Sequence, residues 1–423
     1  MNGGPQRNRV SLWLVTVIVA ATAVTSADEW PQFRGPGGQG HSSETGLPLE
    51  WSESRNIVWS TPVAGVGWSS PVVAGGRIWL TASVETGDPA RGPVTASLRV
   101  MAYDVTTGKE VVNVEVASNR RAGYVNPKNN RASPSPVLEG DRVYVHFGAE
   151  GTAALTTDGR ILWRTQYSYE SQHGAGGSPI IYRDLLIFSC DGDVEAFVVA
   201  LDKNTGKERW KANRRRPSAQ AYSTPLVIRV GDQDQLVSIG AHRVAAYEPL
   251  TGREVWHARY ADGFSNVPRP VFAHGLVYIA TGFQDPTLIA VRPDGTGDVT
   301  RTHVAWTVSR GAPHTPTPIV VGDELYMVSD IGILSALDAQ AGTMLWQARL
   351  PGNYSASPVF VDGRIYFQNE EGVTTVIAPG TSFRRLALNR LDGSTLASMA
   401  VSNGSLYLRS DTRLYRVANA PQP

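Results

Sequence analysis

Short apolar runs alternate with polar, glycine-containing turns along most of the chain, and the pattern recurs eight times at intervals of about 40 to 65 residues. Each copy begins with Ser-x-Pro and an apolar run, followed by a turn and a second apolar run. A small residue, an aliphatic residue, Asp, a Thr-Gly-Lys/Arg turn and Trp complete the copy, most clearly between Ser178 and Trp210. Periods of this length indicate an array of supersecondary units, here of four short strands each.

Prolines mark the first strand of each unit, where a missing N–H removes no bond from the centre of a sheet. Seven residues after most of them, β-branched and aromatic residues begin a second strand, as at Ile78, Val143 and Val277. The eighth copy is degenerate and has Ser398 and Met399 in place of Ser-Pro. The seven prolines are Pro71, Pro136, Pro179, Pro225, Pro270, Pro318 and Pro358.

The Thr-Gly-Lys/Arg turn is expected to join the third strand to the fourth, because glycine supplies the positive φ of a tight hairpin. The aspartate before it, as in Asp104, Asp202 and Asp338, can accept hydrogen bonds from the backbone amides of the turn. The tryptophan that follows can bury its ring against the neighbouring blade. These blade-docking residues are Trp163, Trp210, Trp256, Trp306 and Trp346.

One tryptophan, Trp59, is displaced from this order. It precedes Pro71 by 12 residues, which is also the spacing from Trp346 to Pro358. The strand around Trp59 therefore looks like a fourth strand without a blade of its own, and we expect it to complete the last blade, which removes open sheet edges. The sequence predicts an all-β, eight-bladed β-propeller of four-stranded antiparallel blades over residues 56–423.

The N-terminus has the pattern of a secretory signal peptide. Arg7 and Arg9 precede a mostly apolar run, which ends in small residues up to Ala27. We expect residues 1–27 to be removed after Ala27, with a retained membrane anchor as the alternative. Residues 28–55 are expected to form an extended segment, including a glycine-rich linker at 35–40. The protein is therefore predicted to be periplasmic or secreted.

Composition and charge narrow the classes of partner. The chain has 39 basic and 38 acidic residues among 423, so no global field favours nucleic acid. Its densest basic cluster, residues 214–216, is interpreted as a solvated loop. The single cysteine, Cys190, excludes an intrachain disulfide, and no cysteine near Ala27 could carry a lipid. No later segment is long enough to span a membrane, and we expect a monomer with a periplasmic or envelope protein as partner.

The copies of Ala-Leu-Asp-x-x-Thr-Gly-Lys-x-x-Trp resemble the repeat of the pyrroloquinoline quinone (PQQ) family of β-propellers, over about residues 56 to 418. The stretches 30–36 and 173–179 look like a periplasmic branch of PQQ-like repeat proteins. The family contains quinoprotein alcohol and sugar dehydrogenases, and also non-catalytic propellers such as the outer-membrane assembly factor BamB. The resemblance implies the fold and leaves enzyme and scaffold open.

A PQQ enzyme needs cations for three carboxylates, hard oxygen ligands for Ca²⁺ and a carboxylate base. Quinoprotein alcohol dehydrogenases resemble one another in a pair of adjacent cysteines, which this chain lacks. Its best acidic run, Asp191 to Glu195, lacks the ligand spacing of a calcium loop and is interpreted as a solvated turn. The eight histidines show no metal-binding spacing. We therefore assign no catalytic residue, metal or cofactor, with PQQ and calcium as an alternative.

The leading hypothesis is an exported, non-catalytic protein-interaction scaffold. The alternatives are a propeller that binds a small molecule or a glycan, and a PQQ-dependent dehydrogenase. Any ligand is expected at one mouth of the central channel, where loops of all blades converge. The candidate residues for this site are Asn130, Arg131, His173, Arg269, Arg310 and Tyr354.

Overall fold

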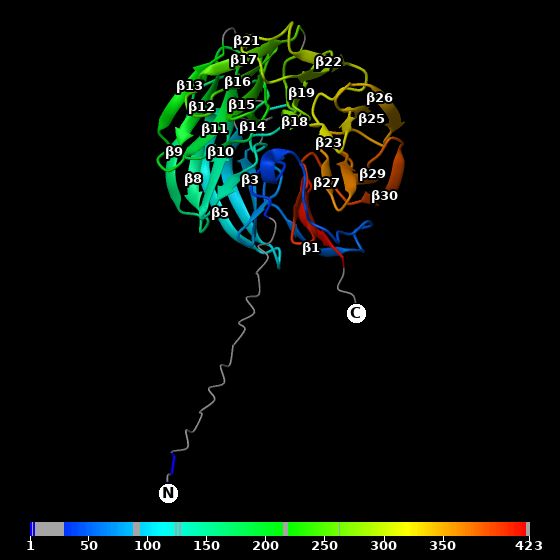
Figure 1. Ribbon diagram of the computed structural model, residues 1–423. Coiled ribbons are helices and arrows are strands. Elements are labelled where there is room, and N and C mark those ends of the chain that lie inside the picture. The colour runs from blue at the N-terminus through cyan, green and yellow to red at the C-terminus, as the bar shows by residue number, and fades with distance from the viewer. Residues whose placement is uncertain are drawn as a thin grey trace.

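The predicted eight-bladed propeller is confirmed by a computed structural model, in which eight sheets are arranged in a ring (Figure 1). The structure describes residues 1, 3–4, 29–87, 94–122, 125–126, 128–214, 219–261 and 263–419. Nearly all of the predicted signal peptide lies outside the described residues, as do Arg215 and Arg216 of the basic cluster. No helix among the described residues is long and apolar enough to cross a membrane.

The blades are numbered here in chain order, and each contains four consecutive strands except where noted below. Blade one contains β2 (Val72–Ala74), β3 (Arg77–Thr86), β4 (Val94–Asp104) and β5 (Glu110–Ala122), and blade two contains β6 (Val137–Glu139), β7 (Arg142–His146), β8 (Thr152–Thr156) and β9 (Ile161–Thr165). Blade three contains β10 (Ile180–Tyr182), β11 (Leu185–Asp191), β12 (Ala196–Asp202) and β13 (Glu208–Asn213), and blade four contains β14 (Leu226–Val230), β15 (Gln233–Gly240), β16 (Arg243–Tyr247) and β17 (Glu254–Arg259). Blade five contains β18 (Val271–Ala273), β19 (Leu276–Ala280), β20 (Leu288–Val291) and β22 (Val304–Val308), and blade six contains β23 (Ile319–Val321), β24 (Glu324–Val328), β25 (Ile333–Asp338) and β26 (Met344–Arg349). Blade seven contains β27 (Val359–Val361), β28 (Arg364–Gln368), β29 (Val373–Ala378) and β30 (Arg384–Arg390), and blade eight contains β31 (Ala400–Ser402), β32 (Ser405–Arg409), β33 (Arg413–Ala418) and β1 (Ile57–Pro62).

The N-terminal strand closes the ring, as its tryptophan predicts. Strand β1 pairs antiparallel with β33, which brings Trp59 opposite Arg416. The last blade therefore has the order β1-β33-β32-β31, with its outermost strand taken from the beginning of the propeller domain. Joining the first and last strands of the domain in one sheet leaves no unpaired edge at the seam between the ends of the ring.

The predicted turns form as expected from their sequence. Asp202 Oδ1 accepts hydrogen bonds from the backbone amides of Asn204 (3.0 Å) and Thr205 (3.0 Å), and Gly206 adopts a positive φ of 71°. Asp104 makes the same contacts in blade one, and Asp338 makes them in blade six. These carboxylates have a local structural role, because each fixes the hairpin between the third and fourth strands of its blade.

The tryptophans contact the hairpin of the next blade. A Cβ atom at Gly252, in the blade-four turn, would lie 2.5 Å from the Trp210 ring of blade three, so only glycine fits this contact. The Trp210 indole N–H also donates to the carbonyl of Pro249 at 3.0 Å. The same packing on a glycine of the next blade is made by Trp59 on Gly108, Trp163 on Gly206 and Trp306 on Gly342.

Blade four departs from this arrangement. The following blade has a different third-to-fourth connection, which adds β21 (Gly297–Asp298) as a short parallel strand beside β17. Trp256 lies opposite Gly297 and is fully buried. Its indole donates to Gln235 Oε1 at 2.8 Å in place of a backbone carbonyl of the next turn. The repeat is therefore modified locally while the ring is preserved.

The N-terminal segment before β1 crosses the middle of the ring, where Figure 1 shows its blue helical turn. Trp30 pairs with Val73 in blade one, and the Phe360 amide in blade seven donates to the Gly40 carbonyl at 2.8 Å. The interpretation of residues 35–40 as an extended linker is wrong, because Pro36–Gly38 form a 3-10 helix, η1, packed into the channel. We call residues 30–41 the plug.

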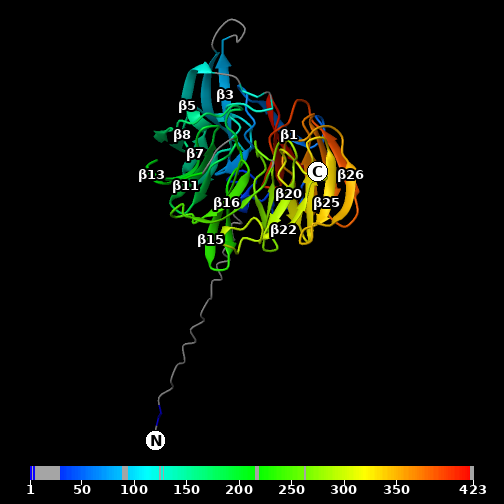
Figure 2. The same ribbon diagram turned by 90° about the horizontal axis from the view of Figure 1, so that it is seen from above.

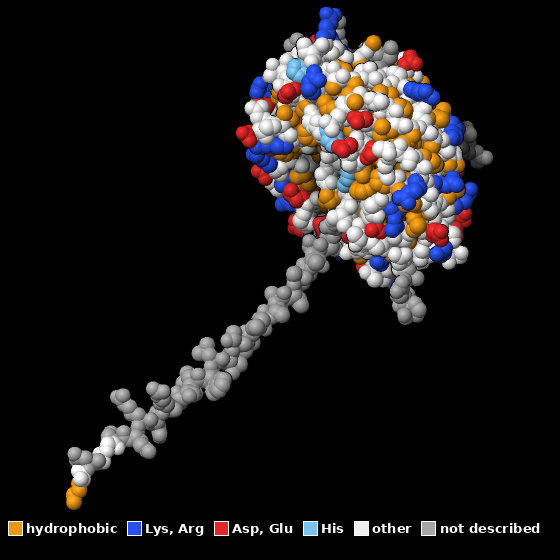
Figure 3. Space-filling model, turned by 45° about the vertical axis from the view of Figure 1, so that its right-hand side comes forward, with side chains coloured by type: hydrophobic (Ala, Val, Ile, Leu, Met, Phe, Trp, Pro, Cys, Tyr) orange, Lys and Arg blue, Asp and Glu red, His pale blue; other side chains and the backbone are white. Residues whose placement is uncertain are grey.

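The hairpin of β3 and β4 is the longest in the ring and extends beyond the neighbouring blades in Figure 2. It corresponds to the insertion in the first blade that the sequence shows between Trp79 and Tyr103. On the face in Figure 3, basic and acidic side chains are interspersed, in keeping with the balanced composition.

Candidate functional site: the open mouth of the central channel

The central channel contains a cavity of about 720 Å³, a size typical of small-ligand sites. Its walls come from the connections between blades and from the turns between second and third strands. Phe33 of the plug is among its lining residues, so the N-terminal segment closes one end and the loops surround the other. The plug therefore borders one end of the cavity, and we call the end surrounded by the loops the mouth.

A ring of hydroxyl groups lines this cavity at the start of the first strands. The residue before the proline of each repeat is Ser or Thr in most blades, and in most of these its hydroxyl accepts the backbone N–H of the equivalent residue in the preceding blade. Ser70 N–H donates to Ser135 Oγ at 2.9 Å, and Thr317 N–H donates to Ser357 Oγ at 3.0 Å. The further links are Ser135 to Ser178, Ser178 to Thr224, Arg269 to Thr317 and Ser357 to Ser398.

The hydroxyl ring is interrupted at two blade junctions, and a buried arginine lies at each. Arg269 takes the place of the hydroxyl in blade five, and its Nε donates to the Pro225 carbonyl at 3.1 Å. Arg409 lies between blades eight and one, and its Nη1 donates to Ser69 Oγ (2.6 Å) and to the Thr81 carbonyl (2.9 Å). Both guanidinium groups therefore join neighbouring blades by bonds to oxygen atoms.

Arg34 and Arg269 also hold the plug in place. Arg269 Nη1 donates to the carbonyls of Phe33 (2.9 Å) and Gly38 (3.1 Å). Arg34 donates to the carbonyls of Pro318 and Pro358, both at 3.2 Å, in blades six and seven. Burial lowers the pKa of Arg269 to about 9, and burial together with Arg269 lowers the pKa of Arg34 to about 9. Both groups remain cationic at neutral pH.

One side of the mouth is apolar and aromatic. Phe283 and Ile331 expose 51% and 58% of their surface, and both line the cavity. Phe283 makes edge contacts with Phe264 (ring centroids 5.6 Å apart) and with His314 (5.8 Å). With Val267, these five residues form a patch that we call the aromatic rim. All five line the cavity, and exposed apolar groups gathered in one place mark interaction sites.

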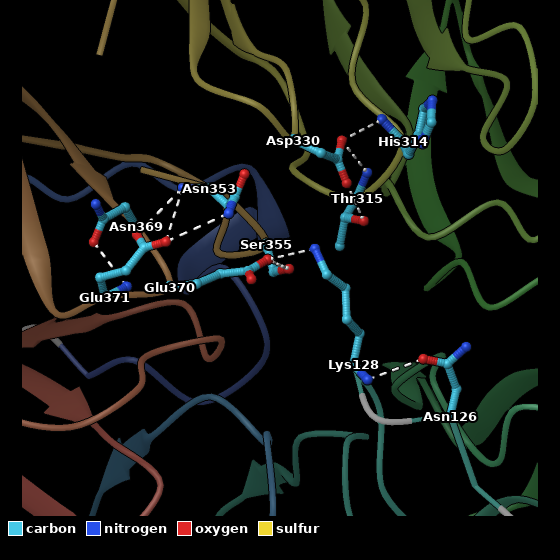
Figure 4. Close-up of polar contacts among 10 residues, drawn as sticks. All are labelled: Asn126, Lys128, His314, Thr315, Asp330, Asn353, Ser355, Asn369, Glu370 and Glu371. Carbon is cyan, nitrogen blue, oxygen red and sulfur yellow. Dashed lines mark hydrogen bonds and ion pairs between the residues drawn. The ribbon is translucent and has the colours of Figure 1, made fainter. Parts of the chain in front are cut away.

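The other side of the mouth is polar (Figure 4). Lys128 Nζ, in the connection between blades one and two, lies 2.9 Å from Glu370 Oε1 of blade seven. Ser355 Oγ donates to the same carboxylate oxygen at 2.6 Å. This ion pair joins loops of blades that are not neighbours in the ring, so it narrows the mouth on the side away from the aromatic rim.

Asp330 is the acidic residue among the described residues that line the cavity. Its Oδ2 accepts the His314 amide at 2.7 Å, and its Oδ1 accepts the Thr315 hydroxyl at 2.7 Å. These bonds, visible in Figure 4, fix the loop that carries His314 at the aromatic rim. The carboxylate of Asp330 is thus already used in a local turn.

The structure scatters the six residues predicted at the mouth. His173 lines the cavity and lies against Tyr222, with ring centroids 6.0 Å apart. Asn130 is buried and caps its own loop through the Ala132 amide, and Arg131 lies 3.4 Å from Glu85. Neither these two residues nor the remaining three line the cavity: Arg269 lies beneath the ring of hydroxyls, Tyr354 is fully buried in the core, and Arg310 is exposed.

Two solvated-loop interpretations are wrong for one residue each, Asp191 and Arg214, whereas residues 193–195 are exposed in a turn, as predicted. Asp191 is the last residue of β11 and is buried, and Arg214, which follows β13, is buried as well. Arg214 Nε lies 2.9 Å from Asp191 Oδ1. Because the two residues are 23 positions apart in the sequence, no local pattern identifies the pair. Cys190 beside them is fully buried, and burial raises the pKa of its thiol.

The described lining does not fit PQQ with a calcium ion. No group of three His, Cys, Asp or Glu side chains that could hold a metal occurs in the described part of the chain. Asp330 supplies the lining carboxylate and already accepts three hydrogen bonds. The buried arginines Arg34 and Arg269 bond backbone carbonyls beneath the cavity and do not line it.

A family model described as outer membrane protein assembly factor BamB matches residues 57–222 and 195–421, which together span all eight blades. The chain belongs to the BamB family. BamB of Yersinia pestis is 24% identical over 342 residues, covering 75% of this chain and 77% of that protein. The crystal structure of BamB from Moraxella catarrhalis superposes with a TM-score of 0.58 at 16% identity, covering 86% of this chain and 99% of that one. At this identity the superposition shows the shared fold.

The BamB-family chain is also similar to a quinoprotein. The quinoprotein ethanol dehydrogenase of Pseudomonas aeruginosa is 25% identical over 196 residues, which cover 41% of this chain and 28% of the enzyme. The match therefore spans less than a third of the enzyme. The resemblance to the PQQ-like repeat family is confirmed, with relatives of both kinds.

Sequence reasoning missed the hydroxyl ring, the plug and the aromatic rim. The ring did have a signal, since Ser or Thr directly precedes six of the seven prolines. Phe264 and Phe283 lie in irregular connections without periodicity, so nothing in the sequence placed them together.

Proposed function

We propose that this BamB-family propeller is an exported, non-catalytic scaffold of the cell envelope, and that a partner protein docks on the mouth of its channel. The observation that carries the proposal is the aromatic rim beside the open cavity. Exposed aromatic and aliphatic side chains around a concave centre are the usual anchors of protein interfaces. The family match and the 75% coverage by BamB of Yersinia pestis, whose name describes an assembly factor, support the scaffold class.

Quantitative affinity capture from an envelope extract tests the docking face. The rim variant Phe283→Ser/Ile331→Ser removes two exposed anchors, while Leu345→Ser in the outer strand β26 removes an exposed apolar residue far from the mouth. We expect the rim variant to capture at least tenfold less partner protein than the wild type, and the Leu345 variant to capture as much as the wild type. The reason is that truncating an anchor at the centre of an interface commonly costs about 2 kcal/mol of binding free energy. Equal capture by both variants would refute the docking face.

A binding site for a small molecule or glycan is a second candidate, which the cavity volume of about 720 Å³ favours. A ligand that binds the folded state raises its melting temperature. A sugar or metabolite that raises the melting temperature of the wild type, but not that of a variant with a changed cavity-lining residue such as Ser70→Ala, would favour this candidate. Dye reduction with added PQQ, Ca²⁺ and an alcohol panel addresses the dehydrogenase alternative, and we expect no turnover.

A further inference from the structure

The hydroxyl ring presents hydrogen-bond donors to the cavity. Ser135, Ser178, Thr224, Thr317 and Ser357 each accept a backbone N–H, and no residue in the described part of the chain accepts a bond from their own O–H groups. All five line the cavity. Each of these hydroxyl oxygens therefore already accepts a hydrogen bond, while its O–H group can still donate one to a ligand. A cavity wall with several such donors favours a ligand group rich in hydrogen-bond acceptors.

Positive charge accumulates next to the hydroxyl ring, at buried arginines that do not line the cavity themselves. Within the described residues, no carboxylate lies within 4.0 Å of the guanidinium groups of Arg34, Arg269 or Arg409, which bond carbonyl and hydroxyl oxygens instead. Arg34 Nε and Arg409 Nε are buried and have no hydrogen-bond partner there. Three buried cations without a counter-charge produce a positive potential, which attracts an anion into a low-dielectric cavity.

The shape of the channel restricts how a polypeptide could reach the hydroxyl ring. The plug lies across the far end, where Phe33 lines the cavity and Arg269 binds the carbonyls of Phe33 and Gly38, so we expect a chain to enter from the mouth. The mouth is apolar at Phe283 and Ile331, where the last side chains of a peptide could pack. A chain terminus that enters from this side would place its end group at the hydroxyl ring.

We infer that the channel binds the C-terminal segment of a partner protein, with the terminal carboxylate held by the hydroxyl ring above the buried arginines. This inference rests on the proposed scaffold function and names the part of the partner that is recognised. Capture of a terminal carboxylate by convergent donors is an established mode of peptide recognition.

Affinity selection on the purified full chain tests the inference. The probes are a pool of random hexapeptides with a free C-terminal carboxylate and the same pool with a C-terminal amide, with retained members identified by mass spectrometry. We expect retention of free-acid peptides whose affinity falls at least tenfold on amidation. Equal retention of amides, or no retained peptide, would overturn the inference.

Ser70 provides a matched pair of variants, because its hydroxyl lines the cavity and accepts none of the bonds between blades that the structure describes. Ser70→Ala removes one donor and should weaken the best free-acid peptide about tenfold, whereas Ser70→Thr keeps the donor and should bind like the wild type. Equal affinity of all three proteins would contradict the proposed carboxylate contact.

Acetate and inorganic phosphate separate a chain terminus from a small anion. If either one raises the melting temperature while no free-acid peptide is retained, the site takes small anions and the inference fails. If partner capture depends on Phe283 and Ile331 but peptides bind equally as acids and amides, the scaffold function stands and carboxylate recognition falls. The two proposals therefore fail in distinguishable ways.

Discussion

At the scale of single residues, local patterns in this sequence were informative and distant pairings were not. Asp202 and Gly206 are only four positions apart, so their shared role in one hairpin is written in the repeat. Asp191 and Arg214 meet only because β11 and β13 belong to one folded blade. The sequence shows that both residues are charged, but it does not show that they are buried. Burial matters because it makes the pair costly to desolvate and costly to break.

The buried Asp191 carboxyl predicts a pH dependence of stability. Burial raises its pKa to about 6, from an ordinary value of 3.8, although Arg214 opposes the shift. Between these pH values the folded state binds a proton more readily than the unfolded chain. The stability from Asp191 is therefore fully present below pH 3.8 and is lost as the pH rises through 6.

The shift corresponds to about 3 kcal/mol, and urea unfolding of the wild type and Asp191→Asn between pH 4 and pH 7 measures it. We expect the free energy of unfolding of the wild type, relative to the variant, to increase by up to about this amount as the pH falls. Parallel curves for the two proteins would show that Asp191 does not titrate in this way.

At the scale of elements, the closure of the ring could be predicted because it depends on one spacing, from Trp59 to Pro71. The plug could not be predicted, because its glycines carry no periodicity and its contacts are with five blades: one, two, five, six and seven. Gly38 illustrates this, since a Cβ atom there would lie 2.0 Å from Arg269 Nη1. The glycine is required by an arginine 231 positions away.

Docking of one blade on the next predicts different costs for two glycine substitutions. Gly252 and Gly231 both have positive φ, of 71° and 55°, but a Cβ at Gly252 would clash with Trp210 whereas the space around Gly231 is open. Gly231→Ala should cost about 1 to 2 kcal/mol from backbone strain alone. Gly252→Ala should cost at least about 1 kcal/mol more, because the ring must move. Equal losses in chemical denaturation would show that Trp210 adjusts freely.

At the scale of the whole molecule, the number of blades and the channel followed from the repeat, whereas the character of the mouth did not. The repeat supplies the strands and the hydroxyl ring, but the residues at the mouth come from connections such as those of Phe264, Lys128 and His314, which vary from blade to blade. Of the six residues expected at the mouth, His173 lines the cavity. Fold and function are thus written in different parts of this chain.

The predicted export of the protein can be tested in the cells that produce it. We expect the mature chain in the envelope fraction to begin at Asp28, because the basic, apolar and small-residue regions before it have the order of a signal peptide. Mass spectrometry of the intact protein measures this directly. A protein that keeps residues 1–27 in that fraction would favour a retained anchor, and a wholly cytoplasmic protein would contradict export.

The central claim is that a partner protein docks on the mouth of the channel, and site-specific photo-crosslinking in living cells tests it most directly. A photoreactive phenylalanine analogue at Phe283 lies in the aromatic rim, and the same analogue at Leu345 in β26 lies on the outer surface of blade six. We predict a discrete adduct with an envelope protein from position 283 and none from position 345. The same adducts from both positions, or no adduct from position 283, would contradict the account.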